Sequence, residues 1–350
     1  MIYLPRSSLR WLLWMSLALG AALAAHAQSS PAIQEEGAAG PGASSGLVAW
    51  LKRMHEASRA NSYIGTFVVS APGGDLSSAR IWHACDRIAN TQVERVETLT
   101  GPPRSTFRHD DQVVTFFEDS RVVRREKRSD FEQFPSVGKP DDDIAQHYEV
   151  KQLGKGRVAG YATDVIQLVP RDSLRFGYRI WVEKRTGLLT KLQTLAVDGR
   201  VVEQSAFSEL ELDAPVSVAQ LSQMMTRTEG YRMEKVQVER TSAQAEGWAL
   251  KEPVPGFRSM RCLRRAMGAS GQTPRTTQCI FSDGLASVSL FLEPYDPDRA
   301  AKEGLLALGA TYTLTRRLSD GGGDWWLTAV GEVPPQTLER FAATIERIAR

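Results

Sequence analysis

Few side chains in this sequence are spaced for catalysis or metal binding. Beyond residue 27 the chain has four histidines: His55, His83, His109 and His147. None is followed by a second histidine four residues later, as a zinc-binding helix requires. The segment 42–46 (Gly-Ala-Ser-Ser-Gly) matches the nucleophile elbow of serine hydrolases, but it lacks the preceding strand that the elbow requires. The glycines at 321–323 precede Asp-Trp and not the Lys-Ser/Thr of a phosphate loop. We therefore predict no catalytic residue, no metal site, no cofactor and no enzymatic activity.

The three cysteines, Cys85, Cys262 and Cys279, allow one intramolecular disulfide. Cys262 and Cys279 lie on the two arms of an expected hairpin, at similar distances from a loop centred near residues 270–271. Opposite positions on two such arms can form a cross-strand disulfide in an oxidising compartment. We predict the Cys262–Cys279 disulfide. Cys85 then remains either as a buried thiol or as the site of an intermolecular bridge.

The N-terminus has the pattern of an export signal. Arg6 and Arg10 form a positive region, residues 11–25 an apolar core, and Ala25-His-Ala27 a small-x-small cleavage pattern. We predict a signal peptide at 1–27 and a disordered leader at 28–45 that is rich in Gly, Ala and Ser. The alternative is an uncleaved anchor, although about fifteen apolar residues are short for a membrane span.

The charge balance argues against nucleic-acid binding. The chain has 43 Lys and Arg against 41 Asp and Glu, and removal of Arg6 and Arg10 with the signal peptide would leave 41 of each sign. A net charge of zero provides no general attraction for phosphate backbones. We predict no nucleic-acid partner.

Residues 174–212 have the clearest structural pattern, a meander of three antiparallel strands. The segment 174–182 alternates apolar with polar or small residues, which is typical of a strand with one buried face. Gly187 and Asp198-Gly199 supply the turns into the second and third strands. The phase of the third strand slips near 206–208, which predicts a β-bulge there.

Strand patterns dominate residues 63–212, which indicates about ten antiparallel strands after a short amphipathic helix at 47–60. Such a series favours a curved sheet or a partly closed barrel, whose concave apolar face must be covered by helices or by a ligand. The candidate lining residues of a lipid-sized pocket are Phe67, Val69, Ile81, Phe116, Tyr178 and Ile180. Alternation alone leaves open whether helices simply cover these side chains.

We place a large domain at 46–213, a connecting segment at 214–245 and a small domain at 246–350. The connecting segment begins with a short helix at 215–228 that Ser217 caps. The small domain has the predicted order βββαββα, with a helix at 297–308 and a last helix that begins at Pro335. The predicted fold class is therefore mainly β plus α+β.

Several segments together resemble the RseB/MucB family, the periplasmic regulators of the envelope-stress sigma factor sigma-E. They span nearly the whole mature chain: 50–54 (Trp-Leu-x-Arg-Met), 63–67 (Tyr-x-Gly-Thr-Phe), 99–104 (Leu-x-Gly-Pro-Pro-Arg), 157–160 (Arg-Val-Ala-Gly), 171–181 (Arg-Asp-x-Leu-Arg-x-Gly-Tyr-Arg-x-Trp), 186–189 (Thr-Gly-Leu-Leu), 255–257 (Pro-Gly-Phe), 281–289 (Phe-Ser-Asp-Gly-Leu-Ala-Ser-Val-Ser) and 330–335 (Val-Gly-Glu-Val-Pro-Pro). No single segment carries the resemblance, which rests on their shared order.

The resemblance implies a fold and a function. The large domain is expected to be an unclosed antiparallel β-barrel with helices across it, similar to the lipoprotein carriers LolA and LolB. The expected function is binding of the periplasmic region of the membrane-spanning anti-sigma factor, which protects that factor from regulated proteolysis. Lipopolysaccharide or lipoprotein acyl chains are the expected signals for its release. The expected location is the periplasm, and the oligomeric state stays open, a homo-oligomer included.

The segment 281–289 is our candidate for the partner-facing part of the small domain. The candidate partner-binding residues are Phe281, Leu285, Val288 and Leu290. The alternative is that their dense apolar alternation marks a core strand. The alternative function is a periplasmic lipoprotein or lipid carrier, which would share the cavity but would not need a second domain.

Overall fold

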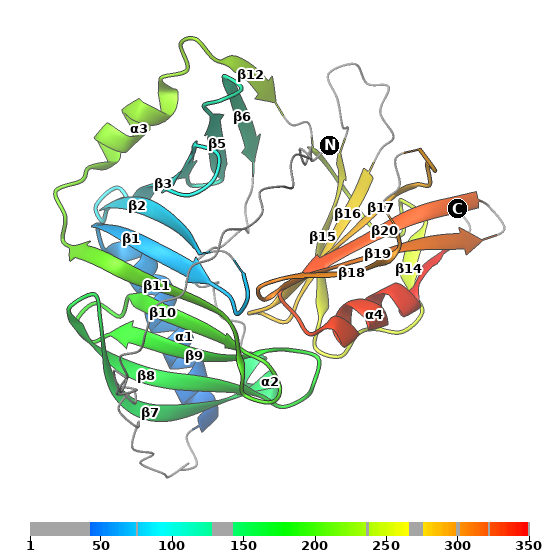
Figure 1. Cartoon of the computed structure of the whole chain (residues 1–350), viewed down its shortest axis with the longest axis horizontal. Helices are drawn as coiled ribbons and strands as arrows, with labels where there is room; N and C mark the ends of the chain where they lie inside the picture. Colours follow the sequence, from blue (N-terminus) through cyan, green and yellow to red (C-terminus); the bar gives the residue numbers. More distant parts are fainter. Residues whose placement is uncertain are drawn as a thin grey trace, which may run out of the picture. The chain divides into compact units, whose positions relative to one another are not determined.

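A computed structural model of the chain describes residues 43–74, 76–127, 143–235, 238–265, 276–298, 302–320 and 323–348. Within them the chain forms two large β-sheets and one two-stranded sheet (Figure 1). Both large sheets belong to the compact unit Gln34–Arg350. The predicted signal peptide and most of the predicted leader lie outside the described residues. None of the described helices is long and apolar enough to cross a membrane.

The first large sheet contains twelve strands. In chain order they are β1 (Tyr63–Ser70), β2 (Ser77–Asp86), β3 (Thr91–Thr98), β4 (Arg104–His109), β5 (Gln112–Phe117), β6 (Val122–Lys127), β7 (Tyr148–Val158), β8 (Tyr161–Pro170), β9 (Gly177–Glu183), β10 (Leu189–Leu195), β11 (Val201–Leu212) and β12 (Arg232–Lys235). Their order in the sheet is β12-β6-β5-β4-β3-β2-β1-β11-β10-β9-β8-β7. All neighbours are antiparallel except β12 and β6, which are parallel. The two outer strands do not pair with each other, so the sheet is open.

The predicted meander is β9, β10 and β11, and its third strand pairs with β1. In that pairing Thr66 lies opposite Glu209 and Phe67 opposite Phe207, so Ser208 is the extra residue of a bulge. The bulge predicted at 206–208 is confirmed.

Helix α1 (Ala43–Ala60) covers one face of the sheet at β7 to β10. Leu47, Leu51 and Met54 recur at helical spacing and are fully buried against Ile166 and Ile180. The predicted helix at 47–60 is thus confirmed, with four more residues at its start. A single turn, α2 (Ile144–His147), packs beside it and leads into β7.

Helix α3 (Val218–Thr226) covers the opposite face of the sheet. Ser217 caps it through a capping box with Gln220, as the predicted N-cap requires. Its buried Leu221 packs on Ala84 and Val93. Directly paired residues of neighbouring strands point to the same face. Such pairs can be followed from Ile180 on β9 across β10, β11 and β1 to β2. They show that Ile81 points to the same face of the sheet as Ile180, which is the face that α1 covers, and that Ala84 points to the opposite face.

The second large sheet has seven strands, in the order β13-β15-β16-β17-β20-β19-β18. They are β13 (Val238–Thr241), β15 (Arg258–Arg265), β16 (Thr276–Ser282), β17 (Ser287–Pro294), β18 (Gly304–Leu308), β19 (Thr311–Asp320) and β20 (Gly323–Gly331). Helix α4 (Pro335–Thr344) packs on one face, where Leu338 and Phe341 join the core. β14 (Trp248–Leu250) and β21 (Ile345–Arg347) form the two-stranded sheet. The predicted fold class, mainly β with an open antiparallel sheet and a smaller α+β domain, is confirmed.

The helix predicted at 297–308 is wrong for its second half, where the chain forms strand β18. Leucine and alanine favour helices, and Gly304-Leu-Leu-Ala-Leu308 has no alternation that would indicate a strand. Pairing with β19 overrides this local preference.

The segment predicted to connect the domains contributes strands to both sheets. Helix α3 packs on the first sheet, β12 pairs with β6 of that sheet, and β13 pairs with β15 of the second. β12 ends at Lys235 and β13 begins at Val238.

Candidate functional site

A buried ion pair joins the two domains. Arg175 lies between β8 and β9, and Asp283 lies in the loop between β16 and β17. The Arg175 Nε donates to Asp283 Oδ2 at 2.8 Å, and both side chains have no exposed surface. Tyr148, the first residue of β7, donates its hydroxyl to the same oxygen at 3.2 Å. Because both charges are removed from water, each needs several partners to offset the cost of burial.

The other nitrogens of Arg175 also have acceptors. Nη1 pairs with Asp172, and Nη2 donates to the Pro255 carbonyl at 3.0 Å. Its guanidinium carbon lies 5.3 Å from the centre of the Phe257 ring, within the range of a cation–π contact. Gly256, between them, has a φ of +79°, and a Cβ there would lie 2.4 Å from Nη2 of Arg175. Any other residue at this position would strain the backbone and overlap the Arg175 side chain.

Asp283 organises its own loop with its second oxygen. Oδ1 accepts hydrogen bonds from the backbone N–H groups of Leu285 and Ala286, at 2.9 and 2.7 Å. One carboxylate thus shapes the β16–β17 loop with one oxygen and binds Arg175 with the other. The four-residue loop 283–286, between the paired residues Ser282 and Ser287, is held in this way.

Each domain contributes one leucine that packs against the apolar core of the other domain. Leu174 of the large domain packs on the core of the small domain, and Leu285 of the small domain packs on the cluster beneath α1. The start of α4 secures the Leu174 segment, because Thr337 Oγ1 donates to the Leu174 carbonyl at 2.6 Å and Gln336 Nε2 to the Ser173 carbonyl at 2.7 Å. This exchange makes each domain part of the other's apolar packing.

A second contact lies at the turn between β18 and β19. Glu203 of β11 accepts a hydrogen bond from the Ala310 N–H at 3.1 Å. Beside it, Phe176 and Val202 of the large domain pack with Ala310 and Tyr312 of the small domain.

Burial determines the protonation of the junction. It raises the pKa of Tyr148 well above the usual value, and Tyr178 and Asp283 raise it further. The pKa of Tyr178 is raised by burial in the same way. Both phenols therefore stay protonated at neutral pH. Burial, and then the charge of Arg175, lowers the pKa of His147, so this imidazole is neutral at pH 7.

The six lipid-pocket candidates do not share one surface. Cross-strand pairs place Phe67, Val69, Ile81, Tyr178 and Ile180 on the α1 face of the sheet. Phe116 lies on the other face, with Met225 of α3. Phe67 and Val69 are half-buried, and the other four are buried. Tyr178 and Ile180 belong to the same cluster as Leu285, so part of the predicted pocket lies next to the junction.

Three of the four partner-binding candidates belong to the core of the small domain. Phe281, Val288 and Leu290 are buried and pack in the cluster that contains Phe341 of α4. The fourth, Leu285, lies in the junction. Sequence reasoning did not single out Arg175 and Asp283. The sequence did contain a signal for both residues, because each lies within a segment that carries the family resemblance.

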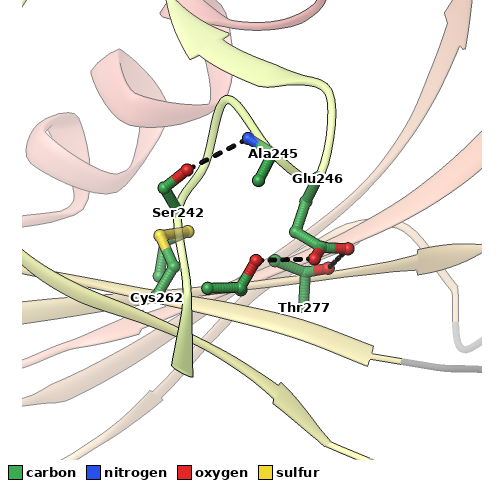
Figure 2. Close-up of a disulfide and its surroundings, with 7 residues drawn as sticks. Ser242, Ala245, Glu246, Cys262 and Thr277 are labelled. Atoms are coloured by element: carbon green, nitrogen blue, oxygen red, sulfur yellow. Dashed lines mark hydrogen bonds between the residues drawn. A yellow bond between two sulfur atoms is a disulfide. The ribbon is translucent and has the colours of Figure 1, made fainter. Parts of the chain in front are cut away.

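The structure joins Cys262 and Cys279, which lie directly opposite each other on β15 and β16, in a disulfide. Figure 2 shows Cys262 near the segment from Ser242 to Glu246. The carboxylate of Glu246 accepts a hydrogen bond from the hydroxyl of Thr277. Glu246 also accepts 2.7 and 3.1 Å hydrogen bonds from Thr241 and Arg264. Cys85 is a half-buried free thiol, 3.6 Å from the Ser62 hydroxyl. No group of three or more metal-ligating side chains occurs in the described ranges.

An open antiparallel sheet and a smaller α+β domain, joined through a buried ion pair, define a two-domain β-rich architecture. Family models match both halves: the MucB/RseB N-terminal domain matches residues 47–225, and the MucB/RseB C-terminal domain matches residues 242–346. The chain belongs to the MucB/RseB family. The predicted resemblance is confirmed.

Relatives of known role match over most of their length. The sigma factor AlgU regulatory protein MucB of Pseudomonas aeruginosa is 30% identical over 85% of this chain and 89% of its own. The sigma-E factor regulatory protein RseB of Escherichia coli K12 is 25% identical over 85% of this chain and 90% of its own.

Solved structures show the same fold. A crystal structure of MucB in complex with MucA(peri) has a TM-score of 0.65 and 27% identity, over 86% of this chain and 99% of that one. The complex of Pseudomonas aeruginosa MucA and MucB has a TM-score of 0.67 and 28% identity, and the match covers 87% of this chain and 100% of that one.

Proposed function

We propose that this chain is a periplasmic, non-enzymatic regulator of a sigma-E-type stress response. It binds the periplasmic region of a membrane-spanning anti-sigma factor and shields that region from regulated proteolysis. The observation that carries the proposal is the match of both domains to a family whose members regulate sigma factors, one of which was solved with MucA(peri).

The release signal in this proposal is an acyl chain of lipopolysaccharide or of a lipoprotein. The half-buried Phe67 and Val69 on the α1 face are the accessible part of the predicted lipid site. Each buried CH₂ of an acyl chain contributes about 0.8 kcal/mol. A ligand that enters beneath α1 reaches the cluster of Tyr178 and Ile180, which also holds Leu285.

Coupling between lipid and partner follows from that shared cluster. An acyl chain that displaces Leu285 weakens the packing beside the Arg175–Asp283 pair and favours a different domain arrangement. A preference of only a few kcal/mol for one arrangement is enough to change partner affinity strongly. The buried junction thus links the two proposed binding events.

Binding and protection are tested with the mature chain, residues 28–350, and the purified periplasmic region of the anti-sigma factor. Calorimetry gives the dissociation constant, and digestion by the protease that initiates cleavage gives the half-life of the region. Tight binding with a longer half-life supports the proposal. Absence of binding, or binding without protection, contradicts it.

The lipid signal is tested by adding lipopolysaccharide or a diacylated lipopeptide to the complex, with the unacylated peptide as control. We expect the acylated ligands to displace the partner. Phe67→Glu should reduce this displacement, because it places a charge on the apolar face, and Leu99→Glu at an exposed loop position should not. Equal displacement from both variants would remove Phe67 from the site.

A further inference from the structure

Strand β18 is an exposed apolar edge of the small domain. All five of its residues, Gly304 to Leu308, are exposed, and the exposed fractions of Leu305, Leu306 and Leu308 are 45%, 68% and 76%. β18 pairs with β19 on one side, and within the described sheet it has no strand on the other. Backbone N–H and C=O groups on that side are therefore available for pairing.

The other outer strands of the two large sheets carry charges. β7 contains Lys151, Lys155 and Arg157 and an irregular register between Gln152 and Gly154. β12 contains Arg232 and Glu234, and β13 contains Glu239 and Arg240. Charges and bulges are the means by which proteins prevent pairing at sheet edges. Among these four edges, β18 alone has no charged side chain.

The leucines of β18 do not serve the core. None of the three belongs to a core cluster among the described residues. Leu306 lies opposite Thr313, and Leu308 opposite Thr311. Leu305 lies opposite the buried Leu314, so Leu306 and Leu308 point to the face away from α4. Neighbouring exposed leucines outside the core clusters are typical of a surface that is covered in a complex.

The length of β18 favours an extended peptide, and not the β18 strand of a second copy, as the chain that pairs with this edge. Five residues span about 17 Å. Pairing of two such strands is too small to bury the roughly 1,200 Å² of a stable complex. The occupant must therefore continue beyond the strand.

At its end, β18 runs into the junction of the two domains. The strand is followed by Gly309 and Ala310, whose N–H binds Glu203 of the large domain. A chain that pairs with β18 and continues in this direction gains contacts with both domains.

We propose that β18 binds an extended segment of the anti-sigma partner as an added strand. This inference rests on the proposed function, which supplies the partner. Backbone hydrogen bonds supply affinity, and alternate side chains of the segment pack on Leu306 and Leu308. The segment has no proline within its paired residues and apolar side chains on the face that meets these leucines.

The test compares variants of the exposed edge in the full mature chain. Leu306→Lys combined with Leu308→Lys places two charges in the contact, and should weaken binding of the anti-sigma periplasmic region about tenfold or more. Leu99→Lys and Val197→Lys are the matched controls, because these residues are 51% and 66% exposed and lie outside β18. Their affinity should equal that of the wild type. Thermal melting checks that all variants are folded.

Amide hydrogen exchange supplies a second measurement. Addition of the partner should slow exchange at residues 304–308, because added-strand hydrogen bonds protect these amides. Unchanged affinity of the double variant, or unchanged exchange at β18, overturns the inference while the proposed function stands. No binding by the wild type overturns both. A dimeric wild type with protected β18 amides and a monomeric double variant would assign the edge to a second copy and overturn the inference.

Discussion

Arg175 and Asp283 lie 108 residues apart in the sequence and share a 2.8 Å hydrogen bond between fully buried side chains. The arginine comes from the large domain and the aspartate from the small domain. Each domain supplies some partners to its own member, but the Nε of Arg175 and the Oδ2 of Asp283 are paired across the junction. In the native junction the two buried charges neutralise each other. Breaking the junction is costly unless water reaches both charges, because each would otherwise stay buried without its partner.

Arg175→Met should destabilise the protein by about 3–5 kcal/mol, because it leaves the buried charge of Asp283 without its main partner. Urea unfolding measures the loss. The control is Arg185→Met, which breaks a 2.8 Å pair with Asp213 in which both side chains are more than 60% exposed. That loss of stability should be much smaller, because water and salt screen an exposed pair. Equal losses would show that the buried pair is not a major source of stability.

Gly256→Ala should cost more stability than Gly199→Ala. Both glycines have a φ near +80°, so both variants carry the same backbone strain of about 1–2 kcal/mol. At Gly199 nothing lies within 4 Å of the added Cβ, whereas at Gly256 it overlaps Arg175 and His147. We expect a further loss of about 1–3 kcal/mol at Gly256. Thermal melts of the two variants would refute this if their midpoints agree.

Loss of the Cys262–Cys279 disulfide should destabilise the small domain. The cysteines are 17 residues apart, and a closed loop of this size contributes about 3 kcal/mol in the chain-entropy model. Melting of Cys262→Ala/Cys279→Ala should show this loss, and added reductant should lower the melting temperature of the wild type but not of this variant. Cys85→Ser should leave the response to reductant unchanged, since Cys85 is a free thiol.

Acidification should weaken the junction through His147. Its folded-state pKa is lowered, by burial first and by Arg175 second, with Arg258 acting in the same direction and Asp283 and Asp172 against it. The unfolded chain therefore binds more protons than the folded one below about pH 6.5. Stability should rise with pH up to that value and fall as the pH decreases toward the folded-state pKa.

The measurement for His147 is the unfolding free energy between pH 5 and 8, compared with His147→Gln. The variant should lose the part of the pH dependence near 6.5 and keep the rest. Identical profiles would exclude His147 as the titrating group.

Local patterns predicted the features that depend on neighbouring residues. The meander, its bulge at Ser208, the N-cap at Ser217 and the opposed cysteines all follow from alternation, turn residues and hairpin symmetry. Strand β18 was misjudged because five apolar residues without alternation favour a helix until β19 is available to pair with them.

The junction could not be predicted in the same way. Arg175 occupies a polar position within the strand predicted at 174–182, where an exposed side chain is the ordinary expectation. Only the folded chain places Asp283, Tyr148 and the Pro255 carbonyl around it. The partner candidates illustrate the converse, since apolar alternation at Phe281, Val288 and Leu290 marks a buried strand as readily as a binding surface.

Strand β12 lies in the segment that follows α3 and pairs with the sheet of the large domain. The connection from this sheet to the sheet of the small domain is therefore very short. β12 ends at Lys235 and β13 begins at Val238, so three virtual Cα–Cα bonds span at most roughly 11 Å. While β12 stays paired, the lobes cannot drift apart when the ion pair breaks. The short connection keeps the effective concentration of each sheet for the other high. In the proposed function, the contacts of the junction can therefore re-form within one molecule, without a new encounter.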